Sequence, residues 1–179
     1  MNRRANLIAG CNVLFTGILF GFLQWSTFFL LQSYLASTAL VWLLASSVWL
    51  LGSLAGLVTP GRIREPWWLA AAILSYYALF WLAHRHPYEL GLLPLLLVFV
   101  AGMGLYAGRF FRCRRNAPGG ARWLFLIENT GFVLGLLLTV ALLYWTGLPS
   151  LLLAPAFSAA FCLLTLPPAP ASSASRAGP

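Results

Sequence analysis

The sequence predicts an all-α membrane protein, a polytopic bundle of six transmembrane helices. Of its 179 residues, 61% are hydrophobic and only 8% are charged, whereas soluble domains carry about 25% charged residues. Apolar runs long enough to cross a bilayer, about 20 residues each, alternate with short polar segments along almost the whole chain. This organisation leaves no room for a soluble catalytic domain.

The predicted spans are separated by short polar or helix-breaking segments. The tripeptide Gln32-Ser33-Tyr34 predicts a tight turn after the first span, and Pro60-Gly61 ends the second. A loop with two histidines follows the third, an arginine-rich loop over residues 109–122 follows the fourth, and Gly147 separates the last two. The six spans cover residues 7–31, 36–58, 67–82, 90–107, 123–144 and 148–166.

Residues 1–166 are therefore expected to form one six-helix transmembrane domain. The remaining segment, 167–179, consists mainly of Pro, Ala and Ser. Such a composition cannot bury a core, so the tail is predicted to be disordered.

The charges predict the orientation. All eleven basic residues are arginines, against three glutamates and no aspartate, and they lie in short segments between apolar runs rather than in a nucleic-acid-binding patch. With six spans both termini lie on one side, and the excess of arginine marks that side as cytoplasmic. Only Arg85 falls on the opposite side. This predicts a multi-pass protein of the cell (inner) membrane with both termini cytoplasmic. The ten cytoplasmic arginines are Arg3, Arg4, Arg62, Arg64, Arg109, Arg112, Arg114, Arg115, Arg122 and Arg176.

The three cysteines do not predict a cofactor. Cys11, Cys113 and Cys162 lie far apart, with no spacing typical of a metal site, a haem attachment or a disulfide framework. Residues Ile8–Cys11 look like a lipoprotein cleavage site, but only Leu7 and Ile8 follow the arginines as an apolar region, too few for a signal peptide. Cys11 is therefore interpreted as a membrane-helix residue, and neither metal nor cofactor is predicted.

Glycines recur four residues apart in four of the six spans. Glycine lets two helix backbones approach closely, which favours helix packing in lipid. Because the pairs fall on spans one, two, four and five, they indicate a three-plus-three inverted repeat, an organisation common in transporters. The alternative is that glycine is simply frequent in membrane helices. The pairs are Gly17/Gly21, Gly52/Gly56, Gly104/Gly108 and Gly131/Gly135.

These motifs carry a family resemblance. The stretches Thr16–Gln24 and Leu51–Gly56 resemble the opening two helices of the membrane region of spermidine-synthase-like proteins, a region similar to half of the major facilitator fold. Residues Glu128–Gly135 resemble that family's fifth-helix pattern, Asn-Thr-x-Gly-x-x-x-Gly, and Gly147-Leu148-Pro149 its sixth helix. The resemblance covers residues 7–166 and implies a transporter-like membrane scaffold.

Two departures limit what the resemblance implies. The family's first helix usually carries a glutamate and, five residues later, an arginine, where this chain has Gln24 and Phe29. The chain also lacks the glycine-rich loop and the aspartates of the aminopropyltransferase domain that family members often carry. The resemblance therefore does not imply polyamine synthesis.

Four polar residues within the spans are candidate ligand-binding or coupling residues. Glu128 is the strongest, because an ionisable group within a span is costly. Its alternative role is to reach the cytoplasmic interface and pair with Arg122 or another loop arginine. Asn129 and Thr130 either bind a ligand or hydrogen-bond a neighbouring helix, and Gln24 has the same two roles. One glutamate and scattered cysteines supply no acid–base pair, so we expect no catalysis.

The sequence thus predicts a non-catalytic, transporter-like six-helix unit. The alternative is a structural or accessory subunit of a larger membrane complex. The predicted partners are the lipid bilayer and either a second copy of the chain or other membrane subunits, without nucleic acid.

Overall fold

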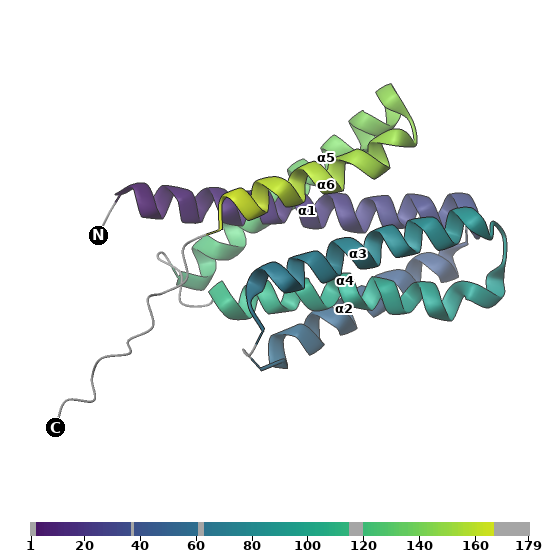
Figure 1. The fold of residues 1–179 in the computed structure, drawn as a ribbon, viewed down its shortest axis with the longest axis horizontal. Helices are drawn as coiled ribbons and strands as arrows, with labels where there is room; N and C mark the ends of the chain where they lie inside the picture. The colour runs from purple at the N-terminus through teal and green to yellow at the C-terminus, as the bar shows by residue number, and fades with distance from the viewer. Residues whose placement is uncertain (1–2, 37, 61–62, 115–119, 167–179) are drawn as a thin grey trace.

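The computed structural model describes residues 3–36, 38–60, 63–114 and 120–166. Every secondary-structure element in this part of the chain is helical (Figure 1). This confirms the predicted all-α, six-helix fold class. The predicted disordered tail lies outside the described residues. The elements are α1 (Arg3–Tyr34), α2 (Ala39–Val58), α3 (Glu65–Arg85), the 3₁₀ turn η1 (Leu90–Leu92), α4 (Leu93–Arg114), α5 (Gly120–Thr146) and α6 (Pro149–Leu164).

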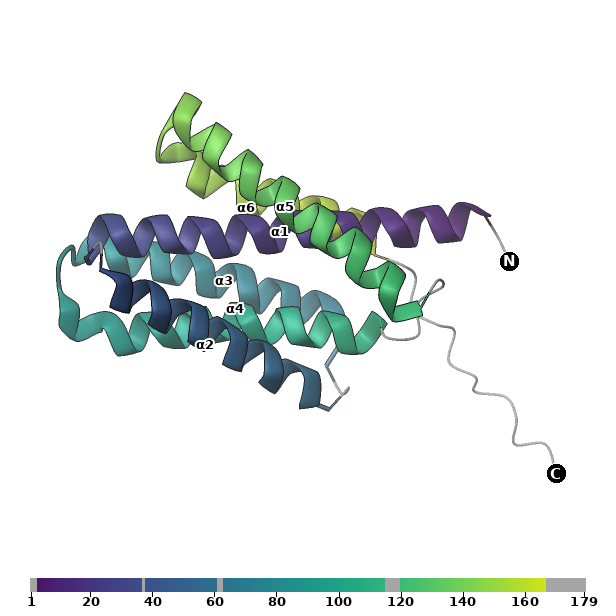
Figure 2. The ribbon, with the colours of Figure 1, turned by 180° about the vertical axis from the view of Figure 1, so that it is seen from behind.

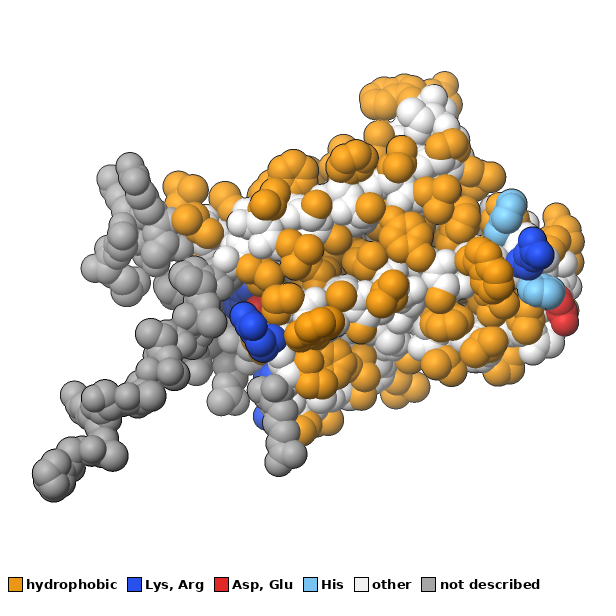
Figure 3. All heavy atoms as spheres, in the orientation of Figure 1, with side chains coloured by type: hydrophobic (Ala, Val, Ile, Leu, Met, Phe, Trp, Pro, Cys, Tyr) orange, Lys and Arg blue, Asp and Glu red, His pale blue; other side chains and the backbone are white. Residues whose placement is uncertain are grey.

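Five of the helices, α1 to α5, are long and apolar enough to cross a membrane. The sixth, α6, has 16 residues, which at 1.5 Å per residue is about 24 Å, shorter than the ~30 Å hydrocarbon core. Apolar side chains also cover the outer face of the bundle (Figure 3). The chain is therefore a multi-pass membrane protein, with a last helix shorter than the 148–166 span that we predicted.

Two predicted boundaries were wrong. Gln32-Ser33-Tyr34 forms the last turn of α1 rather than a separate tight turn, and residues 109–114 of the predicted arginine-rich loop form the last turns of α4. The reason for the second is visible in the contacts. Arg109 and Arg112 donate hydrogen bonds from α4 to carbonyls at the end of α2, and the helical backbone positions them there. Polar residues therefore did not mark the ends of these two helices.

The helices pack mainly across the two halves of the chain. The largest helix–helix contacts are α1 with α5 and α2 with α4, followed by α3 with α4 and α1 with α6. If α1 is matched with α4, α2 with α5 and α3 with α6, these four contacts form two equivalent pairs. The α1–α5 contact corresponds to α2–α4, and the α3–α4 contact corresponds to α1–α6. The contact pattern therefore follows the three-plus-three repeat that we predicted from the glycine spacing.

All eight paired glycines lie at the two largest crossings. A Cβ added at Gly17 or Gly21 would collide with the α5 backbone, and one added at Gly131 or Gly135 would collide with the α1 backbone. The α2–α4 crossing is built in the same way. Its glycines are Gly52, Gly56, Gly104 and Gly108.

The two crossings correspond residue by residue. Gly17 faces the backbone carbonyl of Glu128, and its equivalent Gly104 faces the carbonyl of Trp49. Likewise Gly131 faces the carbonyl of Leu14 in α1, and its equivalent Gly52 faces the carbonyl of Ala101 in α4. We call residues related in this way twins, so that Trp49 of α2 is the twin of Glu128 of α5.

Apart from Glu128, the charged side chains that the structure describes lie at the two ends of the bundle, and Figure 3 shows those of one face. The start of α1 and the end of α6 lie at the same end as the α2–α3 connection and the end of α4 (Figures 1 and 2). We call this the basic end; the opposite end is the histidine end (Figure 3). Arg62, Arg115 and Arg176 lie outside the described residues. The described arginine side chains of the basic end are Arg64, Arg109, Arg112, Arg114 and Arg122, and the histidines and charged residues of the histidine end are His84, Arg85, His86 and Glu89.

Candidate functional site

Glu128 lies inside the α1–α5 crossing. Its residue is only 6% exposed, and it belongs to the stripe of α5 that faces α1, together with Leu124, Gly131 and Gly135. Within the described part of the chain, no hydrogen bond or ion pair of its carboxyl group is found. Arg122 is exposed and forms no ion pair with it. The geometry therefore does not match the alternative in which Glu128 reaches outward to Arg122.

The other three candidates do not converge on Glu128. Asn129 and Thr130 are exposed on the outer surface of α5, and the Thr130 hydroxyl donates to the carbonyl of Leu126 in its own helix. Gln24 is half-buried on α1. It lies seven residues beyond Gly17, the glycine level with Glu128, which is about 10 Å along the helix axis. Of the four candidates, therefore, only Glu128 is buried in the crossing.

The twin crossing shows that close helix packing does not require the polar residues Glu128, Asn129 and Thr130. At the α2–α4 crossing the twin of Glu128 is Trp49, which is also only 6% exposed. The twins of Asn129 and Thr130 are Leu50 and Leu51, both 63% exposed. Two crossings with the same backbone geometry therefore carry an apolar triplet in one case and a polar triplet in the other. Backbone packing alone does not explain the polar residues of α5.

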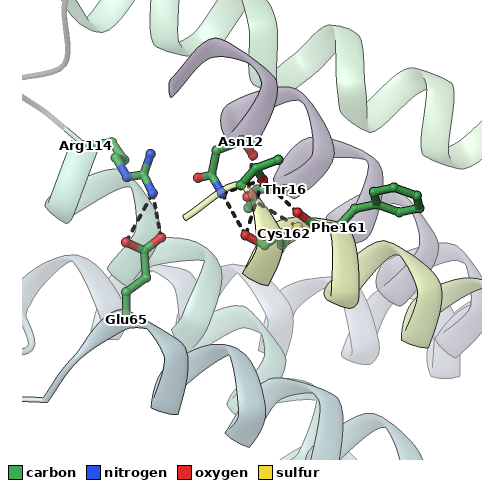
Figure 4. Close-up of polar contacts among 7 residues, drawn as sticks. Asn12, Thr16, Glu65, Arg114, Phe161 and Cys162 are labelled. Atoms are coloured by element: carbon green, nitrogen blue, oxygen red, sulfur yellow. Dashed lines mark hydrogen bonds and ion pairs between the residues drawn. The ribbon is translucent and has the colours of Figure 1, made fainter. Parts of the chain in front are cut away.

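A buried polar cluster near the basic end joins the start of α1 to the end of α6 (Figure 4). The Asn12 side-chain amide donates to the Cys162 carbonyl at 3.0 Å and to the Thr165 hydroxyl at 3.1 Å. The Thr16 hydroxyl donates to the Asn12 carbonyl at 2.8 Å. The side-chain oxygen of Asn12 is buried without a hydrogen-bond partner. We missed this cluster because its members lie 150 residues apart and each resembles an ordinary helix residue.

One ion pair joins α3 to α4 beside this cluster (Figure 4). The Arg114 guanidinium lies 3.0 Å from one carboxylate oxygen of Glu65 and 3.2 Å from the other. It also lies 5.3 Å from the centre of the Phe110 ring, within cation–π range. Both charged side chains are less than one-fifth exposed. The ion pair closes the basic end between α3 and α4.

The end of α2 is capped by arginines from α4. Arg109 donates to the Thr59 carbonyl and Arg112 to the Leu57 carbonyl, both at 2.9 Å. The last carbonyls of a helix lack intrahelical partners and carry negative partial charge, so positive donors satisfy them well. These two arginines therefore stabilise the contact between α2 and α4, besides contributing positive charge to the basic end.

Two tyrosines hold α6 against α3. Pro155 lies inside α6 and has no N–H, so the carbonyl of Leu151, four residues earlier, lacks its helical partner. The fully buried Tyr76 hydroxyl donates to that carbonyl at 2.7 Å. The Tyr77 hydroxyl donates to the next carbonyl of α6. A proline inside an apolar span is the sequence signal that could have predicted this contact.

The arrangement offers one group that can bind a positive charge inside the bundle. In the described ranges, no three His, Cys, Asp or Glu side chains come close enough together to hold a metal ion. Glu65 is already paired with Arg114, and Glu89 lies 3.2 Å from His86 at the histidine end. Among the glutamates, Glu128 alone combines burial within a span with an unpaired carboxyl group in this part of the structure.

Comparison of the chain with protein-family models, with curated proteins and with solved structures found no match. The fold and the site define its class. It is a multi-pass helical membrane protein with two equivalent glycine crossings and a buried carboxyl group at one of them.

Proposed function

We propose that this chain is a non-catalytic, transporter-like six-helix membrane unit in which Glu128 binds the charge of a cation or proton. We place it in the cell (inner) membrane with both termini and the basic end in the cytoplasm, as the arginine asymmetry favours. The contact pattern of two three-helix halves supports a transporter-like architecture.

The observation that carries the proposal is the difference between Glu128 and its twin Trp49. The α2–α4 crossing packs with an apolar side chain at this position. A carboxyl group within a membrane span is costly and marks an ion or proton pathway by default. Since the twin shows that packing does not require the carboxyl group, its presence favours a role in binding charge.

A second candidate, an accessory subunit of a larger membrane complex, is favoured by a different observation. Large buried side chains, among them Tyr76, Tyr106, Phe20 and Phe110, fill the middle of the described bundle. The outer faces are apolar along most helices (Figure 3). Such faces suit contact with lipid or with other membrane subunits.

The substitution Glu128→Gln separates the two functions. It keeps the size and hydrogen-bonding capacity of the side chain but removes the negative charge. The variant and the wild type are reconstituted into liposomes, and proton and sodium entry are followed with ion-sensitive dyes under an imposed membrane potential. The matched control is Trp49→Phe, which alters the twin position without changing charge.

Transport through Glu128 predicts that Glu128→Gln loses ion flux while it folds normally, as judged by monodisperse elution in detergent. Trp49→Phe should keep the flux. An accessory role predicts that Glu128→Gln leaves both the fold and any growth phenotype unchanged. Equal flux in the wild type and Glu128→Gln would contradict the transport proposal and leave the accessory subunit as the better conclusion.

A further inference from the structure

The outer face of α5 carries a continuous stripe of exposed residues. Leu126, Asn129, Val133 and Leu137 are exposed and follow one another at intervals of three or four residues, so they lie on one side of the helix. Leu126, Val133 and Leu137 are each more than half exposed. We call these four residues the α5 stripe.

The α5 stripe contains a polar group at membrane depth. Asn129 lies six residues beyond Trp123, an exposed aromatic residue of the kind that marks a membrane interface, and therefore about 9 Å deeper along the helix. Among the described residues, no hydrogen bond of its carboxamide is found. An unpaired carboxamide facing hydrocarbon costs free energy.

The twin face of α2 is apolar at the levels of Asn129 and Val133. The twin of Asn129 is Leu50, and the twin of Val133 is Leu54; both leucines are at least 60% exposed. The two faces share their backbone geometry, and at the level of Asn129 the α5 face is polar where the α2 face is apolar. One turn away the difference is reversed, because the twin of Leu126 is the half-buried Ser47. The α5 stripe is therefore suited to a partner that satisfies Asn129.

We propose that a second copy of this chain covers the α5 stripe and that the two Asn129 carboxamides hydrogen-bond each other across a two-fold axis. A carboxamide carries one acceptor and two donor hydrogens, so its partial charges are complementary to those of an identical group. Two copies with the same orientation place Asn129 at the same depth, and two-fold symmetry brings equal residues together. Leu126, Val133 and Leu137 then pack on either side of the amide pair.

The role of Asn129 in this dimer follows known helix pairs. A single asparagine in an apolar helix interface specifies the register of the two helices, and interhelical amide hydrogen bonds stabilise helix association in lipid. The Thr130 hydroxyl is already bonded to the Leu126 carbonyl, so it does not need the partner. The proposed dimer does not depend on the transport role of Glu128.

The first experiment is disulfide cross-linking in membranes, with Cys11 and Cys113 replaced by serine. Val133→Cys is compared with Leu54→Cys, its twin on α2. Oxidation with copper phenanthroline should convert Val133→Cys into a species of twice the chain mass at least tenfold faster than Leu54→Cys. Equal rates, no dimer, or an adduct to a different protein at Val133→Cys would overturn the proposal.

The second experiment tests the amide directly. Asn129→Leu gives α5 the residue that α2 carries, and Thr130→Leu is the control. Single-molecule photobleaching in liposomes of decreasing protein density measures the dimer fraction. Asn129→Leu should weaken dimerisation roughly three- to tenfold, and Thr130→Leu should leave it unchanged. A dimer that is insensitive to Asn129→Leu, or equally sensitive to both changes, contradicts the amide pair.

Discussion

Replacing Gly108 by alanine should separate α2 from α4. A Cβ at Gly108 would lie 2.7 Å from the Ser53 carbonyl carbon and 2.9 Å from the Leu57 nitrogen, and closer still to the Ser53 oxygen. Ordinary van der Waals contact begins at 3.4 Å, so the two backbones must move apart by at least about 0.7 Å in a densely packed crossing. Backbone atoms cannot rotate away as a flexible side chain can.

The cost of this overpacking is about 1–3 kcal/mol. Alanine is also intrinsically better than glycine within a helix by about 0.5–1 kcal/mol, which partly offsets the clash. The control Gly10→Ala isolates the clash, because a Cβ at Gly10 meets nothing within 4 Å. Gly10→Ala gains the same helix propensity without displacing another helix.

Thermal unfolding in mild detergent, followed by the loss of the monodisperse elution peak, measures the difference. One kcal/mol corresponds to about 2–4 °C for a chain of this length, so Gly108→Ala should melt several degrees below Gly10→Ala. Gly131→Ala, at the equivalent α1–α5 crossing, should behave like Gly108→Ala. If Gly108→Ala and Gly10→Ala melt at the same temperature, the close backbone contact does not stabilise the bundle.

Three further predictions concern a hydrogen bond, an ion pair and the orientation in the membrane. Tyr76→Phe should lower stability by about 1–2 kcal/mol in a detergent melt, because it leaves a buried α6 carbonyl without its donor; an unchanged melting temperature would contradict that hydrogen bond. Arg114→Gln should destabilise more than the double variant that also carries Glu65→Gln, since the single change leaves one buried charge unpaired; equal losses would mean that the two charges do not interact. For orientation, a cysteine replacing Arg64 should react with an impermeant maleimide only from the cytoplasmic side, and one replacing His86 only from the outer side; the opposite labelling would refute our topology.

The helices and their approximate spans could be predicted because apolar length and periodicity are local properties. The ends were less predictable. Gln32 and Arg112 are polar, and polar residues predict the end of a membrane span, yet both lie within helices, α1 and α4. Helix ends depend on which carbonyls find donors, and the partner of Arg112 lies on α2, far away in the sequence.

The glycine spacing predicted close approach but not which helices meet. Pairing α1 with α5 and α2 with α4 depends on the three-dimensional course of the chain. The same limit applies to the site. Glu128 and Asn129 are neighbours in the sequence, but Glu128 faces α1 and Asn129 faces outward. Which of them faces α1 depends on how α5 is rotated about its axis, and the contact of Gly131 with the α1 backbone fixes that rotation. The contact between Asn12 and Cys162 carries no local signal.

The pairing of helices across the two halves has a consequence for biosynthesis. Neither glycine crossing lies within α1 to α3 or within α4 to α6, so the first three helices leave the ribosome without their principal partners. The α2–α4 crossing can form only after α4 has been inserted, and the α1–α5 crossing only after α5. The nascent chain must therefore keep the exposed glycine surfaces of α1 and α2 unpaired, or shielded by the insertion machinery, until the second half arrives. Two fragments divided near Pro87 should therefore fold only when both are present, and not as two independent three-helix units.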